Sequence, residues 1–283
     1  MVAQDKGLKM RIVILTGDKR RHHALVSCLA RDGHNICAVY IESGYTPPLQ
    51  ENQFGSSEII RYHFSVRDVS EEKVFGSLAS QMESQLKRGT DVKYVRHLSL
   101  RGDEFCDQIS QLAPDLIVVY GTSIIKGKLI SAFEGRILNL HLGLSPYYRG
   151  SGTLFFPFVN NEHQYAGATF MLLDEGIDTG PILHQEAMHL DVGENFHDNC
   201  NNFIYRTFEI YSALICCSGL ERLDMKRSAD KFIWTQEPRR YYKDSDFNEE
   251  TLLHMQKNYG VLQSAGPSLA RRTNPVIFKS TYI

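Results

Sequence analysis

Three polar side chains in two separate segments have the types and spacing that acyl transfer needs. The segment "GRILNLH" at 135–141 has the pattern of a strand, and residues two apart on a strand project to the same face. Asn139 and His141 are therefore expected to lie side by side, while Asp178 falls between two glycines in the loop "EGIDTG". An amide can donate a hydrogen bond to a developing oxyanion, and an imidazole can donate one or carry a proton. The carboxylate can orient the imidazole and favour its charged form, or accept a proton through a water molecule.

These residues predict chemistry only as a set. An Asn-x-His pair alone is a weak motif, because a lone histidine near a strand end more often has a structural role. No serine or cysteine nucleophile accompanies Asn139, His141 and Asp178, which favours transfer without a covalent enzyme intermediate. An amide, an imidazole and a carboxylate that converge on one point suit direct attack of an amine on an acyl carbon.

Short apolar runs alternate with amphipathic segments in the part of the chain that leads to these residues. Strands are predicted at 11–15, 36–42, 92–97, 115–121 and 135–141, and helices at 18–33, 69–89 and 103–114, the second of these helices starting near a capping signal at Ser70. This alternation predicts an α/β fold with a doubly wound, mostly parallel sheet. Ligands bind such sheets beyond the carboxyl ends of the strands. Three of these ends carry Thr16-Gly17, Tyr120–Thr122 and Asn139–His141.

The remainder of the chain has a different texture. A helix is predicted at 153–161, two strands at 165–174 and 181–190 around the glycine loop, and a long helix at 194–223. From about residue 224 the chain is more polar, and we expect a small α+β appendage of short strands around a helix at 248–258. We therefore divide the chain into a main domain at 1–223 and an appendage at 224–283. The polar segment 43–66 is predicted to be a loop that contacts a substrate or covers an edge of the sheet.

The composition excludes several classes of function. Of 283 residues, 42% are hydrophobic and 23% charged, and the net charge is −2 with a pI near 6.6, so no global positive field would collect nucleic acid. No apolar run reaches the roughly 20 residues of a membrane span. Six scattered cysteines without a CxxC pair indicate buried reduced thiols in a cytoplasmic protein, and no ligand set has the spacing of a metal site. The oligomeric state stays open, a homodimer included.

A family resemblance adds to this interpretation. "NLHLGLSPYYRGSGT" followed by "GATFMLLDEGIDTGPILHQ" resembles the 10-formyltetrahydrofolate-dependent formyltransferases, which include methionyl-tRNA, glycinamide ribonucleotide and nucleotide-sugar formyltransferases. The shared pattern is an Asn-x-His strand end, a Ser-Pro loop closing on Arg-Gly, and an aspartate in a D-x-G-x-D-T-G loop. The resemblance is clear over about 115–190, and the sheet pattern extends it to residue 11. It implies a formyltransferase-like Rossmann variant.

The resemblance also implies roles for individual residues. Asn139, His141 and Asp178 would be the catalytic trio, and the chain would need 10-formyltetrahydrofolate as formyl donor but no metal. Backbone groups of two loops, together with Leu144 of a third, would contact the folate. The residues implied in this contact are Tyr120, Gly121, Thr122, Ile124, Leu144, Asp174, Gly176 and Ile177. For Tyr120 and Ile124, plain packing is the alternative. The loop 143–146 reads Gly-Leu-Ser-Pro where the family often has Ser-Leu-Leu-Pro, which leaves its hydrogen bonding to folate open.

Contacts to the acceptor are less defined. No glycine-rich phosphate loop follows the first strand, which argues against glycinamide ribonucleotide as the acceptor. Gly17, Lys19 and Arg20 at a helix start are candidates for holding an anion, with a solvated basic face as the alternative. Tyr148 and Arg149, together with Tyr147, are candidates for stacking or charge contacts with a substrate.

We expect an enzyme that transfers a formyl group from 10-formyltetrahydrofolate to a primary amine, with a nucleotide-linked amino sugar as the leading acceptor. A methionyl-tRNA formyltransferase is one alternative, but its tRNA grip would need clustered cations, and those at 226–227, 239–240 and 271–272 are interleaved with acids. A formyltetrahydrofolate hydrolase with water as acceptor is another, although such relatives usually carry an extra N-terminal domain. A binding module without catalysis would not need the complete trio.

Overall fold

A seven-stranded sheet forms the centre of the molecule. The computed structural model describes residues 10–44, 57–217, 231–265 and 275–279. The strands of the sheet are β1 (Arg11–Gly17), β2 (Asn35–Ser43), β3 (Asp91–Arg96), β4 (Leu116–Tyr120), β5 (Ile137–His141), β7 (Gly167–Leu172) and β8 (Ile182–Ala187). They are arranged in the order β3-β2-β1-β4-β5-β7-β8. The strands β1 to β5 run parallel, and β7 and β8 are antiparallel to their neighbours. The predicted doubly wound, mostly parallel sheet is confirmed.

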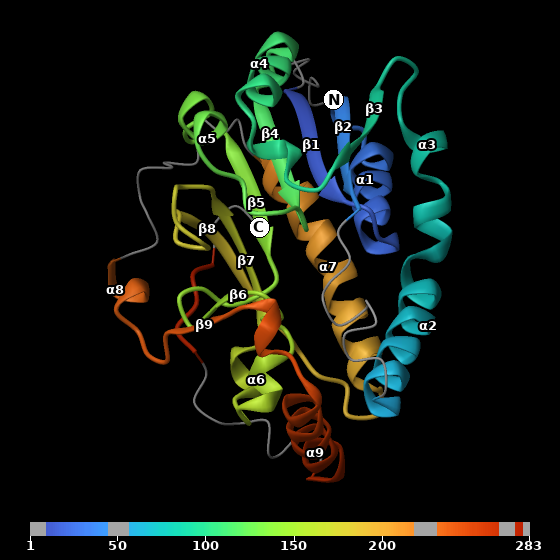
Figure 1. Ribbon diagram of the computed structural model, residues 1–283, viewed down its shortest axis with the longest axis vertical. Helices are drawn as coiled ribbons and strands as arrows, with labels where there is room; N and C mark the ends of the chain where they lie inside the picture. Colours follow the sequence, from blue (N-terminus) through green and yellow to red (C-terminus); the bar gives the residue numbers. More distant parts are fainter. Residues whose placement is uncertain (1–9, 45–56, 218–230, 266–274, 280–283) are drawn as a thin grey trace, which may run out of the picture.

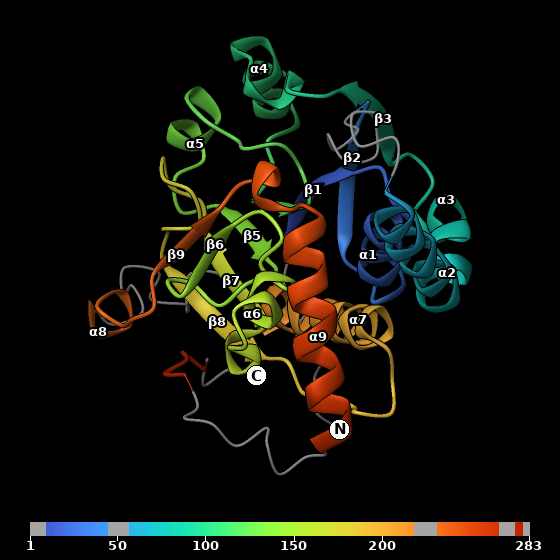
Figure 2. The same cartoon turned by 60° about the horizontal axis from the view of Figure 1, so that its bottom comes forward.

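Helices cover both faces of this sheet (Figures 1 and 2). One face packs on α1 (Arg20–Arg31), α2 (Glu58–Ser80), the short α3 (Met82–Gln85) and α7 (Phe196–Cys217), and the other on α4 (Asp103–Leu112) and α5 (Lys128–Ala132). Successive side chains of β1 point to opposite faces of the sheet and so belong to two different cores. Ile12 and Ile14 belong to the core under α1 and α7, whereas Val13 and Leu15 belong to the core under α4 and α5. A 3-10 turn at Ser99–Arg101 precedes α4.

A smaller layer lies at one end of the sheet. Strands β6 (Tyr148–Gly150) and β9 (Arg240–Tyr242) pair in parallel and form a second, two-stranded sheet. The one-turn helix α6 (Phe156–Val159) packs against α9 (Glu249–Ala265), as both views show. Short helical turns at His163–Tyr165, Lys231–Trp234 (α8) and Asp244–Asp246 complete the described elements. The described C-terminal segment thus contributes a strand that pairs with β6 and a helix that packs against α6 and α2.

Several predicted elements differ from the structure. Part of the predicted loop 43–66 is helical, because α2 begins at Glu58, where Ser57 Oγ accepts a hydrogen bond from the backbone N–H of Ile60. Ser70 does not cap a helix but lies inside α2. The predicted helix 153–161 is shortened to the single turn of α6, and the described residues 275–279 contain no strand. Residues 45–56 and 218–223 of the predicted elements lie outside the described residues.

Two composition-based expectations also have outcomes in the structure. Among the cysteines whose side chains are described, Cys216 is exposed and Cys37 is half-buried, so the expectation of uniformly buried thiols was wrong for these two. Among the described residues, no helix combines the length and the apolar character that crossing a membrane requires.

Candidate active site

Asn139, His141 and Asp178 come together at the carboxyl end of β5. Asn139 and His141 project to the same face of this strand, as period-two alternation requires, and all three residues line one cavity. Nδ1 of His141 lies 3.3 Å from Oδ1 of Asp178, and the side chains are only 6% and 14% exposed. At this separation the carboxylate is placed to orient the imidazole.

The backbone of the glycine loop turns Asp178 toward the cavity. Asp174 organises the loop, because its Oδ1 accepts hydrogen bonds from the backbone N–H of Gly176 at 3.0 Å and from Thr179 Oγ1 at 2.8 Å. Asp178 itself has a left-handed backbone with φ of +52°. Its Oδ2 accepts a hydrogen bond from the backbone N–H of Gly150 at 2.8 Å. One carboxylate oxygen is therefore anchored while the other faces His141.

Both nitrogens of the His141 ring face hydrogen-bond acceptors. Nε2 lies 3.0 Å from the backbone carbonyl oxygen of Tyr148, and Nδ1 faces Asp178. Only a doubly protonated imidazole donates to both at once. A glycine at 143 makes this placement possible, because a Cβ atom there would lie 2.4 Å from Nε2 of His141 and 2.7 Å from Cβ of Thr153.

The cavity has the size of a small-molecule site. Its volume is about 690 Å³, within the range typical of ligand pockets. Most residues for which the resemblance implies folate contacts line it. These are Tyr120, Gly121, Thr122, Ile124, Asp174, Gly176 and Ile177. Ile124 is 41% exposed at the rim, whereas Tyr120 is only 2% exposed. The backbone groups of two loops therefore border the space next to the trio, as folate binding there would require.

Seven other predicted contact residues are not among the residues that line the cavity. These are Gly17, Lys19, Arg20, Leu144, Tyr147, Tyr148 and Arg149. Leu144 is fully buried and packs against Gly167, and the Tyr148 hydroxyl donates to Glu162 within the protein. Arg20 forms an ion pair with Glu72. Arg149 donates to the carbonyl oxygen of Ile177 at 3.4 Å, so its guanidinium contacts the backbone of the glycine loop.

His22 occupies the place between the ends of β1 and β4. Its ring is so close to Gly17 and Gly121 that a Cβ atom at either position would lie within 2.5 Å of it. Nδ1 of His22 accepts the backbone N–H of Lys19 at 3.1 Å, and burial, with Arg21 and Lys19 nearby, lowers the pKa of His22 well below its usual value. His22 is therefore a neutral imidazole that keeps its proton on Nε2 and lines the cavity.

Helix α2 supplies cavity residues that the sequence did not indicate. His63, Arg67 and Glu71 are spaced by four and therefore lie on one face of α2, which lines the cavity. Glu71 pairs with the guanidinium of Arg21, which is 22% exposed. The spacing of four is visible in the sequence, but residues 43–66 are predicted to be a loop. This face of α2 lines the same cavity as the trio only because of tertiary packing, which no local sequence pattern indicates.

A buried imidazole pair joins α2 to the start of α7. Nε2 of His197 lies 3.3 Å from Nδ1 of His63, and both rings line the cavity among aromatic side chains. These are Phe64, Phe155, Phe196 and Phe247. Burial lowers the pKa of His63 to about 4, and burial together with the nearby His63 lowers the pKa of His197 to about 3. Both imidazoles are uncharged at neutral pH.

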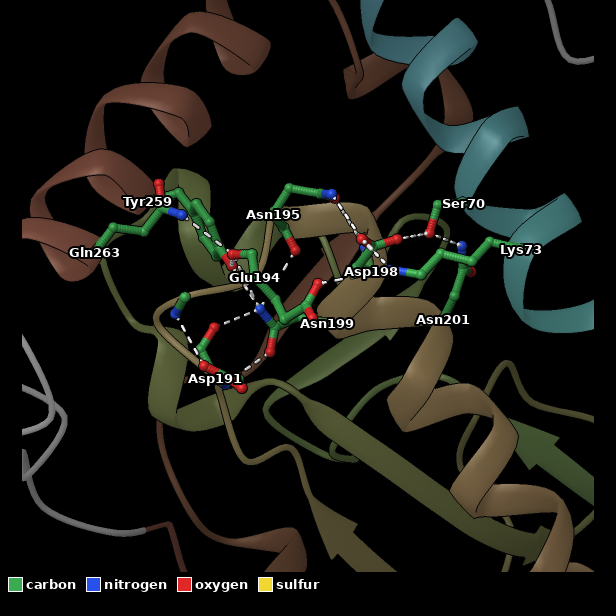
Figure 3. Close-up of polar contacts among 11 residues, drawn as sticks. Ser70, Lys73, Asp191, Glu194, Asn195, Asp198, Asn199, Asn201, Tyr259 and Gln263 are labelled. Carbon is green, nitrogen blue, oxygen red and sulfur yellow. Dashed lines mark hydrogen bonds and ion pairs between the residues drawn. The ribbon is translucent and has the colours of Figure 1, made fainter.

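A polar network fixes this wall of the cavity (Figure 3). Ser70 of α2 donates to Oδ1 of Asp198 at 2.6 Å, and its oxygen accepts a hydrogen bond from Nδ2 of Asn201 at 2.9 Å. Lys73 pairs with Oδ2 of Asp198 at 3.0 Å. Asn201 itself lines the cavity. Because Asp198 and Asn201 belong to α7, the network holds the cavity faces of α2 and α7 in register.

Tyr120 lines the cavity with a side chain that is almost fully buried. Burial raises the pKa of Tyr120 to about 12, against the opposing charge of the nearby Arg21. The ring packs edge-on against His22, with centroids 5.0 Å apart. Tyr120 thus presents an uncharged phenol next to the ion pair of Arg21 and Glu71.

Comparison with known proteins gives matches over most of the chain. The family model described as "Formyl transferase" matches residues 10–203. The methionyl-tRNA formyltransferase of Geobacter sulfurreducens is 30% identical over 163 residues, which are 52% of this chain and 51% of that protein. The corresponding protein of Finegoldia magna is 32% identical over 118 residues, 40% of this chain and 37% of that protein. The chain thus spans about half or less of the length of these relatives.

Solved structures share the fold at low sequence identity. Glycinamide ribonucleotide transformylase 1 from Symbiobacterium toebii has a TM-score of 0.52 and 19% identity, over 74% of this chain and 87% of that one. A sugar N-formyltransferase from a Shewanella species has a TM-score of 0.51 and 15% identity, over 87% of both chains. The arrangement of sheet and helices described above recurs in both.

Proposed function

The chain belongs to the formyl transferase family, and from this premise we propose that it transfers a formyl group from 10-formyltetrahydrofolate to a primary amine. The observation that carries the proposal is the convergence of Asn139, His141 and Asp178 on one wall of a cavity. The folate derivative supplies the activated formyl group. The chain's own residues then have three tasks, which are to hold the reactants, to stabilise developing charge and to move a proton.

The amide of Asn139 and the imidazole of His141 are placed to stabilise negative charge on the formyl oxygen. A bond forms between the amine nitrogen and the formyl carbon, and the bond from that carbon to the folate nitrogen breaks. The amine loses one proton, and the Asp178 carboxylate is the acceptor we assign to it, directly or through a water molecule. The folate nitrogen gains a proton in exchange. Because the Gly150 N–H holds Oδ2 of Asp178, Oδ1 stays in position for this exchange.

For the acceptor we propose a nucleotide-linked amino sugar or a similar small metabolite. Two cations of the described C-terminal segment form ion pairs within the protein, Arg240 with Glu162 and Lys279 with Glu186. Cations used in this way contribute little to a phosphate-gripping surface, which a tRNA acceptor would require. A cavity of about 690 Å³ fits a small acceptor beside the folate. We propose the cytoplasm as the location, since folate-dependent transfer draws on small soluble reactants.

Methionyl-tRNA is the second candidate acceptor, because the relatives from Finegoldia magna and Geobacter sulfurreducens, at 32% and 30% identity, are methionyl-tRNA formyltransferases. For either acceptor we propose the same domain boundary, at 223–224, and the same folate-contacting residues in the loops. A homodimer is likewise compatible with either acceptor.

The experiment is a formyl-transfer assay with the full chain and 10-formyltetrahydrofolate. The acceptor panel holds nucleotide-linked amino sugars, free amino acids, methionyl-tRNA and a sample without acceptor, with mass spectrometry as readout. A product that carries one added formyl group on a sugar amine supports the proposal. Formation of formyl-methionyl-tRNA would identify methionyl-tRNA as the acceptor. Release of formate in the sample without acceptor would identify the protein as a hydrolase. The Asp178→Asn protein is the control that ties the product to this site.

A further inference from the structure

Strand β6 contacts two members of the catalytic trio, His141 and Asp178, through its backbone. The carbonyl oxygen of Tyr148 lies 3.0 Å from Nε2 of His141, and the N–H of Gly150 donates to Oδ2 of Asp178 at 2.8 Å. The two contacts come from one three-residue strand. A shift of β6 therefore displaces His141 and Asp178 together.

The C-terminal strand β9 lies directly against β6. In the parallel pairing, Tyr148 is opposite Arg240 and Gly150 is opposite Tyr242. The N–H of Arg240 donates to the carbonyl oxygen of Tyr147 at 2.8 Å, and the N–H of Ser151 donates to that of Tyr242 at 2.9 Å. Gly150 has φ of +88°, and a Cβ atom there would lie 2.1 Å from the Tyr242 carbonyl oxygen. The strands approach so closely that only glycine fits at this position.

Side chains reinforce the backbone pairing. The guanidinium of Arg240 donates to both oxygens of Glu162, at 2.8 and 3.1 Å, and the Tyr148 hydroxyl donates to the same carboxylate. Nδ2 of Asn160 donates to the hydroxyl oxygens of Tyr148 at 2.9 Å and of Tyr242 at 2.7 Å. Tyr148 of β6 thus contacts both Asn160 and Glu162, whereas β9 contacts Asn160 through Tyr242 and Glu162 through Arg240.

Stacking and charge fix this arrangement further. The Tyr242 ring stacks on Phe156 with centroids 3.8 Å apart and planes 5° apart. Burial by itself would raise the pKa of Glu162, but the hydrogen bonds from Arg240 and Tyr148 and the charge of Arg240 lower it. Glu162 is therefore a carboxylate at neutral pH, and its bidentate contact with Arg240 has the planar geometry that specifies position.

We propose that β9 is a positioning element for formyl transfer, in which Arg240 and Tyr242 hold β6 and β6 holds the His141–Asp178 pair. The inference rests on the proposed function, since it concerns the geometry of the same trio. It assigns to the C-terminal segment a role in the alignment of the reacting groups. Misplacement of catalytic groups by about 1 Å can cost a rate factor of about 100, so a loosened β9 is expected to reduce turnover without abolishing binding.

The first test compares Arg240→Ala with Arg239→Ala. Arg239 is the exposed neighbour in the sequence, so the pair isolates the contact with Glu162 from the loss of a positive charge. We expect Arg240→Ala to lower kcat about tenfold or more while KM for both substrates changes less than about threefold. Arg240→Lys, which keeps the charge but loses the planar fork, should recover only part of the rate. A kcat within twofold of wild type for Arg240→Ala would overturn the proposal.

The second test asks whether Arg240 acts through Asp178. In an Asp178→Asn background there is no carboxylate to align, so Arg240→Ala should lower single-turnover formyl transfer less than about twofold. A general loss of stability would lower both backgrounds by the same factor, and equal factors would contradict a positioning role.

The third test does not depend on activity. In protein with ¹⁵N-labelled histidine, the ring resonances of His141 should shift in Arg240→Ala and in the milder Tyr242→Phe, and not in Arg239→Ala. Tyr242→Phe keeps the ring stacked on Phe156 and removes only the hydroxyl that Asn160 contacts. Unchanged His141 resonances in both variants would overturn the inference. Absence of formyl transfer in the wild-type protein, with shifted resonances in the variants, would instead count against the proposed function alone.

Discussion

Nδ1 of His141 lies 3.3 Å from Oδ1 of Asp178, so an imidazole at a strand end and a carboxylate in a glycine loop form one unit. The second oxygen of Asp178 is held by the Gly150 N–H, and the second nitrogen of His141 faces the Tyr148 carbonyl oxygen. Each member of the pair has one atom anchored to β6 and one atom turned to the other member. The backbone of β6 therefore positions both side chains.

Asp178→Asn tests the charge of this unit. Asparagine tolerates the left-handed backbone at φ of +52° and can still accept from the Gly150 N–H, so the fold should be kept. Because an amide cannot accept the proton that we assign to the Asp178 carboxylate, kcat should fall about 10²- to 10⁴-fold. Steady-state kinetics and calorimetric folate binding are the measurements, with Asp246→Asn at an exposed turn as the matched control. Near-normal turnover would remove Asp178 from the scheme.

Gly143→Ala tests the space next to His141. The new Cβ would lie 2.4 Å from Nε2 of His141 and 2.7 Å from Cβ of Thr153, so the ring must shift away from the Tyr148 carbonyl oxygen. We expect kcat to fall by about tenfold or more.

The matched control is Gly260→Ala on α9. Among the described residues, no atom other than those of its chain neighbours and its own helix backbone lies within 4 Å of the position of its Cβ. Alanine should therefore raise stability by about 0.5–1 kcal/mol through helix propensity. Unfolding in urea and kinetics on both variants distinguish steric displacement from a general effect of adding a methyl group. Equal activities of the two variants would contradict the predicted displacement.

The sequence predicted those parts of the site that depend on local pattern. Period-two alternation placed Asn139 and His141 on one face of β5, and the glycine loop around Asp178 is a contiguous motif. The order of strands and helices also followed from apolar periodicity, which each segment carries by itself. For these features the interactions that decide the structure lie within a few residues.

Contacts between segments far apart in the chain could not be predicted from local sequence patterns. The pairs Arg21–Glu71 and His63–His197 join segments far apart in the chain, and their partners become neighbours only when α1, α2 and α7 pack together. Tyr148 is the opposite case, in which a local sequence pattern was misleading. Its place after a Ser-Pro loop suggested exposure to substrate, but tertiary packing turns its hydroxyl inward to Glu162.

Ser70→Ala tests the network that joins α2 to α7. The Ser70 hydroxyl is buried, donates to Asp198 and accepts from Asn201 (Figure 3), so its removal leaves a buried amide and carboxylate with fewer partners. We expect the free energy of unfolding to fall by about 1–2 kcal/mol. Ser65→Ala, at an exposed position of the same helix, carries the same change in helix propensity and should stay within about 0.5 kcal/mol of wild type. Equal urea midpoints for the two variants would show that the buried bonds contribute nothing net.

The buried pair of His63 and His197 predicts how stability depends on pH. Burial lowers the pKa of His63 to about 4 and, together with the nearby His63, that of His197 to about 3, whereas an unfolded histidine has its pKa near 6.5. Between pH 6.5 and these folded values, the unfolded chain binds protons that the folded chain does not. Stability therefore falls as the pH falls through this window, by at most about 1.4 kcal/mol per pH unit for each imidazole.

His197→Gln should remove one of these two contributions. Between pH 7.5 and pH 5, the variant is expected to lose about 2 kcal/mol less of its free energy of unfolding than wild type, as measured by urea titration at each pH. Other buried histidines whose pKa is lowered, such as His22 and His184, add to the loss in both proteins and cancel in the difference. His254→Gln, at an exposed position, is the matched control and should follow wild type. If His197→Gln loses as much stability on acidification as wild type does, the pKa of His197 in the folded protein lies near that of an unfolded histidine, and the prediction is wrong.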